Sequence, residues 1–270
     1  MKKLICLILS LMILLTLVGC NDSHDKGESA LNEVINPHDY GVPKFPVNRK
    51  VVLHYDMSHH SYMLFDMSGY GNHGIMHNIS DDDFTQNGDD DILKLPGTDG
   101  SYIEIPLSVK KDINYKKGFS VEMTFTPRTN QHQFLWTLGT GYQTDYLRIN
   151  PAGLYGGYFE TTIKTQGNNE NTLGKTRKLN EDEMSVVTVT YDGEYFDVYV
   201  NGEHLGYTEN KNHDLGTIFA GNGKDILGYI AKSNWDDPYC DAVITDFKIY
   251  NKTLDEEDVL KTYNEFAARQ

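Results

Sequence analysis

The sequence predicts an all-β fold, a sandwich or jelly roll of two antiparallel sheets with one short helix at its C-terminal end. From Val47 onward, short runs rich in β-formers recur with turn residues between them. The dipeptides Asp192-Gly193 and Asn201-Gly202 suit type I′ hairpins, because such turns need two successive positive φ angles. Helical periodicity is convincing only over 254–267, so strands dominate the chain.

The N-terminal residues predict a cleaved signal rather than part of the fold. Lys2 and Lys3 precede an apolar run of about 15 residues, shorter than the roughly 20 that span a bilayer. The run ends in Leu-Val-Gly-Cys, which resembles the lipobox of bacterial lipoproteins, where the cysteine after the cleavage site is acylated. We therefore expect a lipoprotein signal peptide over 1–19, lipidation of Cys20, and membrane attachment through the lipid anchor only. An uncleaved short anchor is the alternative.

The composition of the remaining chain limits its domain organisation and the partners that it can bind. Residues 20–46 are polar, with three prolines and no sustained period, so they predict a flexible tether before one large domain over 47–270. Loss of Lys2 and Lys3 with the signal moves the formal charge from −15 to −17, which disfavours nucleic acid and anionic headgroups. Neutral polymers, or anions bridged by a divalent cation, are more compatible partners. Among these we expect a polysaccharide or other glycan, outside the cytoplasm. Cys240 then stands alone, so we expect no disulfide and no cysteine metal site.

The predicted strands follow in order along the domain. Over 119–127, apolar and polar side chains alternate cleanly, which predicts a half-buried strand with one wet face. Over 186–207, the two turn dipeptides bracket an alternating strand, which predicts a three-stranded meander. The helix predicted over 254–267 has an acidic first turn, which the helix dipole favours, and one apolar stripe. The other predicted strands are 51–57, 91–97, 101–106, 133–139, 146–150, 154–162, 225–231 and 242–250.

Four segments, in this order and spacing, resemble a known family. They are YDMS with LFDMSGYGNHGIMHN, then GFSVEMTFTP, then VVTVTYDGEYFDVYVNGEHLG, then ITDFKIYNKTLDEEDV. The set is similar to the laminin-G-like, concanavalin-A-like jelly rolls of bacterial surface proteins. This resemblance implies two curved antiparallel sheets packed face to face, often with one structural calcium ion and often with a bound glycan. It does not imply one activity, because the fold hosts lectins, adhesion domains and hydrolases.

The glycine-rich stretch over 64–78 is the candidate metal loop. In the family, this loop contributes to a calcium site together with an acidic residue near the start of the last strand. The resemblance therefore makes Asp66, Asn72 and Asp246 the candidate calcium ligands, and calcium prefers such oxygen donors. Thr245 holds the family's usual aspartate position, so only Asp246 stays acidic there. The alternative is a metal-free Ω-loop held by Asx-type hydrogen bonds.

The spacing of carboxylates along the sequence indicates whether the protein could be a glycoside hydrolase. A glycoside hydrolase needs two of them, about 5 Å apart for retention or roughly 6.5–9.5 Å apart for inversion. A close pair on one strand would appear as acids at i and i+2 or i+4, and the predicted strands carry only single acids. The acids that stand alone in their segments include Glu104, Glu122, Glu160 and Asp197. We therefore predict a protein that is not an enzyme, with a glycoside hydrolase built from convergent strands as the minority alternative.

Aromatic residues in polar surroundings favour glycan binding, because the apolar C–H faces of sugars stack on rings. Trp235, in the polar segment KSNWDDPY, is the aromatic side chain that we most expect to be exposed. The alternative is a loop residue that folds back onto the sandwich, because Trp is readily buried. Tyr142 and Tyr146 near a glycine-rich turn, and Arg148 on the next strand, are the other predicted carbohydrate contacts, whereas Trp136 is expected in the core. The sequence thus favours a lectin-like, lipid-anchored protein of the cell surface, with a protein-binding adhesin as the runner-up.

Overall fold

Two antiparallel sheets make up the fold. The structure is a computed structural model, and it describes residues 47, 50–88, 90–98, 100–140, 143–221, 223 and 225–269. These residues belong to one compact unit, Lys44–Gln270. The predicted signal peptide, tether and lipidation site Cys20 lie outside the described residues. Among the helices described, none combines the length and the apolar character that crossing a bilayer requires.

The first sheet has eight strands within the described residues, and its last strand in sequence lies near its centre. Strands β8 (Phe119–Pro127) and β17 (Asp241–Tyr250) pair antiparallel there, and β1 (Val51–Tyr55) pairs with β17 outside the main order. The main order is β15 (Glu203–Glu209), β14 (Tyr195–Val200), β13 (Ser185–Tyr191), β8 (Phe119–Pro127), β17 (Asp241–Tyr250), β6 (Asp90–Pro96) and β5 (Phe84–Asn87).

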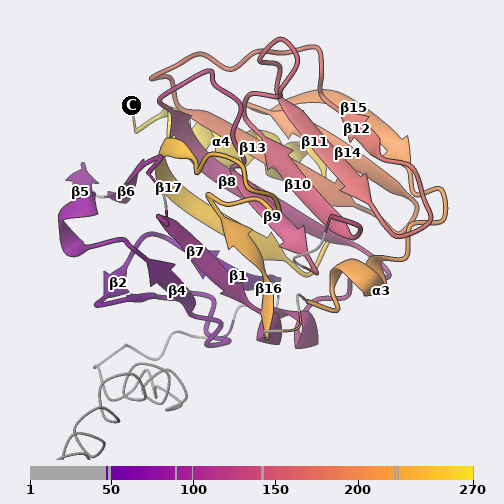
Figure 1. The fold of residues 1–270 in the computed structure, drawn as a ribbon, viewed down its shortest axis with the longest axis horizontal. Coiled ribbons are helices and arrows are strands. Elements are labelled where there is room, and N and C mark those ends of the chain that lie inside the picture. The colour runs from indigo at the N-terminus through magenta and orange to yellow at the C-terminus, as the bar shows by residue number, and fades with distance from the viewer. Residues whose placement is uncertain are drawn as a thin grey trace, which may run out of the picture. The chain divides into compact units, whose positions relative to one another are not determined.

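The second sheet has nine described strands and packs against the first. Figure 1 shows the two layers, with strands of one sheet in front of strands of the other. Its order is β12 (Asn171–Leu173), β11 (Glu160–Lys164), β10 (Tyr146–Asn150), β9 (Trp136–Gly139), β16 (Ile226–Ile230), β7 (Tyr102–Pro106), β4 (Gly74–His77), β3 (Met63–Leu64) and β2 (His59–His60). The two-sheet antiparallel jelly-roll sandwich predicted from the sequence is confirmed.

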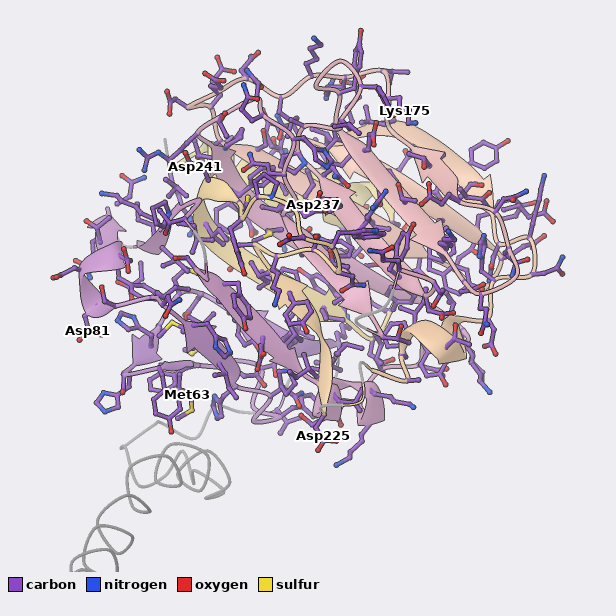
Figure 2. All side chains as sticks on the ribbon, in the orientation of Figure 1. Met63, Asp81, Lys175, Asp225, Asp237 and Asp241 are labelled. Carbon is purple, nitrogen blue, oxygen red and sulfur yellow. The ribbon has the colours of Figure 1, made fainter. Side chains whose placement is uncertain are left out.

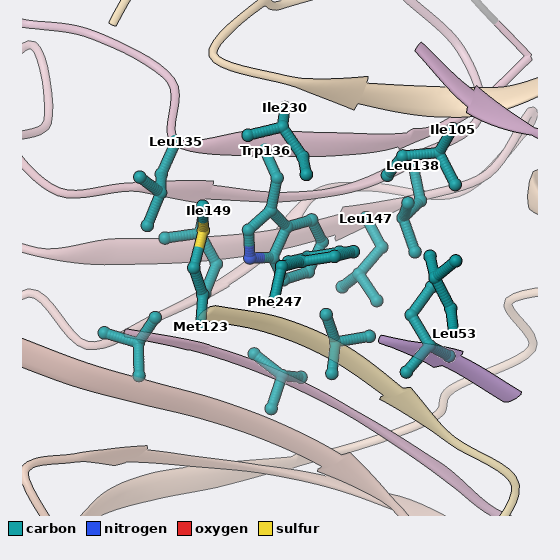
Figure 3. Packing of buried hydrophobic residues seen from close by; sticks show 14 of the residues in the cluster. Leu53, Ile105, Met123, Leu135, Trp136, Leu138, Leu147, Ile149, Ile230 and Phe247 are labelled. Carbon is teal, nitrogen blue, oxygen red and sulfur yellow. The ribbon is translucent and has the colours of Figure 1, made fainter. Parts of the chain in front are cut away.

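The core lies between the sheets and is built from side chains that alternate inward along each strand. Trp136 of β9 has no exposed surface, as predicted, and Figure 3 places it among Met123 and Phe247 of the other sheet. Phe247 also stacks on Tyr55, with ring centroids 6.1 Å apart. Cys240 is fully buried, and this burial raises the pKa of its thiol. The thiol therefore stays protonated and acts as a small core side chain.

The predicted helix forms as α4 (Glu256–Ala267) and covers the outer face of the first sheet. Asp255 caps it by accepting a hydrogen bond from the Asp258 N–H at 2.8 Å. Val259 packs in a cluster with Tyr199 and Leu254, which fixes the helix on the sheet. The outer face of β8 is therefore buried, not wet as the alternation predicted. The shorter helices in the described part of the chain are α3 (Leu215–Ile218), η2 (Asp81–Asp83) and η3 (Leu107–Lys111).

The predicted meander forms from β13, β14 and β15, but its two turns differ. At Asn201-Gly202 both residues have positive φ, 53° and 77°, as a type I′ hairpin requires. At the other turn the Asp192 N–H donates to the Tyr195 carbonyl, so the central residues are Gly193 and Glu194. Only the glycine has positive φ there, 105°, which matches the pattern of a type II′ turn. The type I′ assignment of Asp192-Gly193 was therefore wrong by one position.

Candidate functional site

A cleft of about 240 Å³ opens on the outer face of the second sheet. The pairing register of the strands determines which side chains form the floor of the cleft. Arg148 of β10 lies opposite Thr137 of β9 and Thr162 of β11, so all three point to the outer face. The lining also includes residues from loops on both sides, among them Lys175 and Asp237, which Figure 2 labels. The cleft thus combines a rigid strand floor with loop walls.

The Arg148 guanidinium is the centre of an aromatic cage. Its Cζ atom lies 4.8 Å from the ring centroid of Trp235, 4.9 Å from that of Tyr146 and 5.1 Å from that of Phe134. Trp235 stacks on Phe134, with centroids 5.8 Å apart and planes at 18°, and meets Tyr146 edge-on. Cation–π attraction of this kind is worth about 0.5–2 kcal/mol for each well-placed ring. The Arg148 Nε is buried and has no hydrogen-bond partner among the described residues.

The loop that carries Trp235 is held by its own hydrogen bonds. The buried hydroxyl of Ser233 accepts a hydrogen bond from the Trp235 N–H at 2.9 Å. The same hydroxyl donates to Asp237 Oδ2 at 2.8 Å. Asp237 in turn lies 3.8 Å from His132 Nε2 on the far wall. The half-buried indole is therefore fixed against the sheet, with one part of its surface facing the cleft.

Three carboxylates line the cleft, and each has a partner. Glu170 accepts a hydrogen bond from the Tyr146 hydroxyl and lies 3.9 Å from Arg148 Nη2. Burial, and then this hydrogen bond, raise the pKa of the Tyr146 hydroxyl, which keeps its proton. Glu160 lies 3.9 Å from Lys175 Nζ and packs where a Cβ at Gly153 would collide with it. With Asp237, these acids supply hydrogen-bond acceptors around the aromatic cage.

The structure brings together three of the predicted carbohydrate contacts, Trp235, Tyr146 and Arg148. Tyr142 lies outside the described residues. Tyr146 has no exposed surface, so it does not offer the sugar contact predicted for it. Its ring instead packs against Arg148 and Trp235 from the side of the sheet. The sequence reasoning missed Glu160 and Glu170 as parts of the site. The predicted strand over 154–162 begins instead at Glu160, and the preceding loop exposes 81% of Tyr155 at the rim.

The glycine-rich loop folds around the buried carboxylate of Asp66. Its Oδ1 accepts the N–H groups of His54 and Ser68, both at 3.0 Å, and its Oδ2 accepts the N–H of Asn72 at 2.8 Å. Asn72 is occupied too, because its Nδ2 donates to Val52 O and its Oδ1 accepts the Ser108 hydroxyl at 2.6 Å. The loop is thus held by Asx-type hydrogen bonds to the Asp66 carboxylate.

The third predicted calcium ligand, Asp246, contacts two nitrogen groups of the protein. Its Oδ2 lies 2.8 Å from His54 Nε2, and its Oδ1 lies 2.5 Å from Lys248 Nζ. Burial alone would raise the pKa of Asp246, but Lys248 and His54 outweigh it and hold that pKa below its ordinary value of 3.8. Because donors already occupy Asp66, Asn72 and Asp246, these side chains as placed do not fit a shared calcium site. In the described part of the chain, no cluster of three His, Cys, Asp or Glu residues is arranged to hold a metal ion.

The chain has the fold of several solved structures. Domain 4 of AbnA, a GH43 extracellular arabinanase from Geobacillus stearothermophilus, in complex with arabinotriose, is 16% identical, with a TM-score of 0.58 over 78% of this chain and 97% of that one. The binding domain of botulinum neurotoxin DC in complex with rat synaptotagmin II is 15% identical, with a TM-score of 0.57 over 83% of this chain. A botulinum neurotoxin type C structure, described as dependent on interaction with two ganglioside molecules for cell entry, is 17% identical, with a TM-score of 0.57 over 83% of this chain.

The chain spans about half the length of these two toxin structures, 53% and 52%. At such identities the likeness concerns the fold alone. No curated protein matches the chain. The family model described as the concanavalin A-like lectin/glucanases superfamily matches residues 97–260, which include the cleft and most strands of both sheets. The chain belongs to this superfamily.

Proposed function

We propose that the protein binds a glycan in the cleft beside Trp235. The observation that carries this proposal is the aromatic cage of Arg148, with carboxylates around it and the exposed ring of Tyr155 at its rim. Sugars present apolar C–H faces, which stack on aromatic rings, and hydroxyls, which need donors and acceptors. The cleft offers both in one place, on a rigid sheet.

The structural neighbours support a binding role on this fold. The arabinanase domain was solved with arabinotriose, and the type C neurotoxin is described as dependent on two gangliosides. Another neurotoxin domain was solved with a protein, synaptotagmin II. A protein-binding adhesin is therefore the second candidate, favoured here by the exposed side chains of Leu154 and Tyr155. A glycan fits better because the cleft is concave and mixes rings with carboxylates.

A glycoside hydrolase is the third candidate, because Glu160, Glu170 and Asp237 meet in one cleft. Such an enzyme needs a carboxylic acid and a second carboxylate, both directed at the scissile bond. Here Glu170 is engaged by Tyr146 and Arg148, and Asp237 by Ser233. These contacts suit fixed hydrogen-bond acceptors better than a proton donor and a nucleophile, so we propose binding without hydrolysis.

We propose that Cys20 carries a lipid anchor and presents this cleft at the cell surface, outside the cytoplasm. The support is the short apolar run followed by Leu-Val-Gly-Cys. The net negative charge, −15 for the full chain, disfavours anionic polymers and so favours neutral glycans.

A glycan array tests the proposed function. The chain over 21–270 is applied as wild type, as Trp235→Ala, and as Tyr207→Ala, which removes an exposed ring on the opposite sheet. We expect neutral oligosaccharides to bind the wild type and Tyr207→Ala but not Trp235→Ala. Absence of any glycan signal from the wild type would contradict the proposal. Release of reducing sugar from a bound glycan would instead favour the hydrolase.

A further inference from the structure

A second aromatic cluster lies on the same sheet face and is not part of the cleft. Tyr102 of β7 stacks on His77 of β4, with centroids 4.4 Å apart and planes at 6°. Tyr229 of β16 meets Tyr102 edge-on at 5.7 Å, and Tyr239 stacks beside it at 6.0 Å. All four rings are partly exposed. We call Tyr102, Tyr229, Tyr239 and His77 the tyrosine cluster.

Strand register places the tyrosine cluster and the cleft along one row. Arg148 of β10 is opposite Thr137 of β9, Thr137 is opposite Tyr229 of β16, and Tyr229 is opposite Glu104 of β7. Directly opposed residues of a sheet point to the same face. Neighbouring strands are about 4.8 Å apart, so the backbone positions of Arg148 and Tyr229 are separated by about 10 Å. This span exceeds a single sugar ring and suits a chain of linked sugars.

One loop contributes to both groups. The segment between β16 and β17 supplies Trp235 and Asp237 to the cleft. It also supplies Tyr239 and Lys232 to the tyrosine cluster, where Lys232 Nζ lies 4.3 Å from the ring centroid of Tyr102 and 4.7 Å from that of Tyr229. The loop therefore fixes the position of one aromatic group relative to the other.

The tyrosine cluster repeats the chemistry of the cleft. Each combines stacked rings, a cation over those rings and a carboxylate. Glu104 provides the carboxylate, with Oε2 at 3.2 Å from His77 Nε2. Burial, then the charge of Glu104, raise the pKa of Tyr102 to about 12, so its hydroxyl keeps a proton to donate. Rings, donors and acceptors again match the two kinds of surface on a sugar.

We infer that the tyrosine cluster is a second sugar-binding subsite, and that the protein recognises an extended neutral oligosaccharide which contacts both groups. This inference rests on the proposed function, because it takes the cleft as the first subsite. A disaccharide fills the cleft alone, whereas a longer chain also stacks on the tyrosine cluster. Affinity therefore rises with chain length until both subsites are filled.

The test is calorimetric titration with size ladders, from disaccharide to hexasaccharide, of arabinan, xylan, glucan and mannan fragments. The chain over 21–270 is used as wild type, Tyr239→Ala, Lys232→Gln and Trp235→Ala. For a ladder that binds, we expect Tyr239→Ala to weaken hexasaccharide binding by about tenfold, the scale of one aromatic contact, and to leave disaccharide binding unchanged. Lys232→Gln keeps all rings and should weaken the hexasaccharide in the same selective way. Trp235→Ala should weaken both ligands.

The outcomes separate this inference from the proposed function. If folded Tyr239→Ala and Lys232→Gln bind the hexasaccharide as the wild type does, the second subsite is wrong, while binding in the cleft stands. If the disaccharide and hexasaccharide bind the wild type equally tightly, the second subsite is again wrong. If no ladder binds the wild type although the glycan array was positive, recognition of an extended neutral chain is wrong. If the array was also blank, the proposed function fails with it.

Discussion

The indole ring of Trp235 covers the guanidinium of Arg148, with 4.8 Å between the ring centroid and Cζ. This contact joins a loop residue to the middle of a sheet. It gives the cleft an aromatic surface whose position depends on rigid strands, and the Ser233 hydroxyl holds the loop from the other side. A site built in this way needs little ordering when a ligand binds, which favours affinity.

The hydrogen bonds around Asp66 predict a large structural effect. Asp66→Ala leaves three backbone N–H groups without their acceptor, at about 1–3 kcal/mol each, so we expect a loss of more than about 3 kcal/mol. Asp56→Ala is the matched control, because Asp56 accepts a single N–H in the neighbouring turn. Urea unfolding of both variants measures the difference. Equal, small losses would show that the Asp66 carboxylate does not hold the loop.

A comparison of thermal unfolding in chelator and in calcium tests whether the loop around Asp66 binds the ion. Calcium bound at a hundredfold excess over its Kd would stabilise the wild type by about 2.7 kcal/mol. Because protein donors occupy the predicted ligands, we expect the same Tm in chelator and in millimolar calcium. If chelator lowers the Tm of the wild type but not the Tm of Asp66→Ala, our expectation is wrong and the calcium site predicted from the sequence is present.

The type I′ turn predicts a loss of stability for Gly202→Val. A β-branched residue at φ of 77° costs more than about 1 kcal/mol, and its Cβ would also lie 2.9 Å from Leu260 Cδ1. Gly71→Val is the matched control, since Gly71 has the same φ with no neighbouring atom within 4 Å. We expect thermal unfolding to show a larger decrease in Tm for Gly202→Val than for Gly71→Val. An unchanged Tm for Gly202→Val would contradict the turn assignment.

The buried carboxyl of Glu122 predicts a pH dependence. Burial raises its pKa above 4.5, although Lys248 and the hydrogen bond from Tyr250 partly oppose this. The folded state therefore keeps the proton longer than the unfolded state, and this group's contribution to stability falls as pH rises above 4.5. Asp246 acts in the opposite direction, since its lowered pKa means that its contribution is lost only below about pH 3.8.

Glu122→Gln tests this contribution, because glutamine can still accept from the Tyr250 hydroxyl. We expect the free energy of unfolding of the wild type to fall relative to Glu122→Gln as pH rises above 4.5. Exposed Glu257→Gln on α4 serves as the control and should follow the wild type. Parallel curves for wild type and Glu122→Gln would show that burial does not perturb this carboxyl.

Lipid anchoring predicts the behaviour of Cys20→Ala. The variant lacks the sulfur that would carry the acyl chain, so we expect mature protein to be lost from the membrane fraction after a high-salt wash. Ser10→Ala, within the same apolar run, is the control and should stay with membranes. Membrane retention of mature Cys20→Ala would contradict the lipoprotein assignment.

Local sequence patterns predicted many of the strands in the fold. The strand over 119–127 and the strand over 146–150 were predicted with the bounds that the structure shows, because alternation and turn residues act over a few positions. Burial of the outer face of β8 could not be predicted from the same pattern. It depends on α4, which lies more than a hundred residues later in the chain and docks there.

The site was predicted only in part, for a similar reason. Trp235 and Arg148 stood out as an aromatic ring in a polar loop and a cation on a strand. Glu160 and Glu170 did not, because their place in the cleft depends on the pairing of β11 with β10 and β12 and on where β11 begins. Asp66 was predicted as a calcium ligand. Its role as an acceptor could not be predicted, because it depends on N–H groups that only the folded backbone brings to it.

The most direct test of the account is titration of wild type and Trp235→Ala with the neutral oligosaccharide that binds best on the array. Tyr207→Ala is the matched aromatic control on the opposite sheet. Removing the indole uncovers Arg148 and deletes the stacking surface, so we expect at least about a tenfold loss of affinity. We also expect a lower Tm from the lost contacts with Arg148 and Phe134, in a variant that still folds cooperatively. Tyr207→Ala should bind as the wild type does. Equal affinity of folded Trp235→Ala and wild type would contradict glycan binding in this cleft.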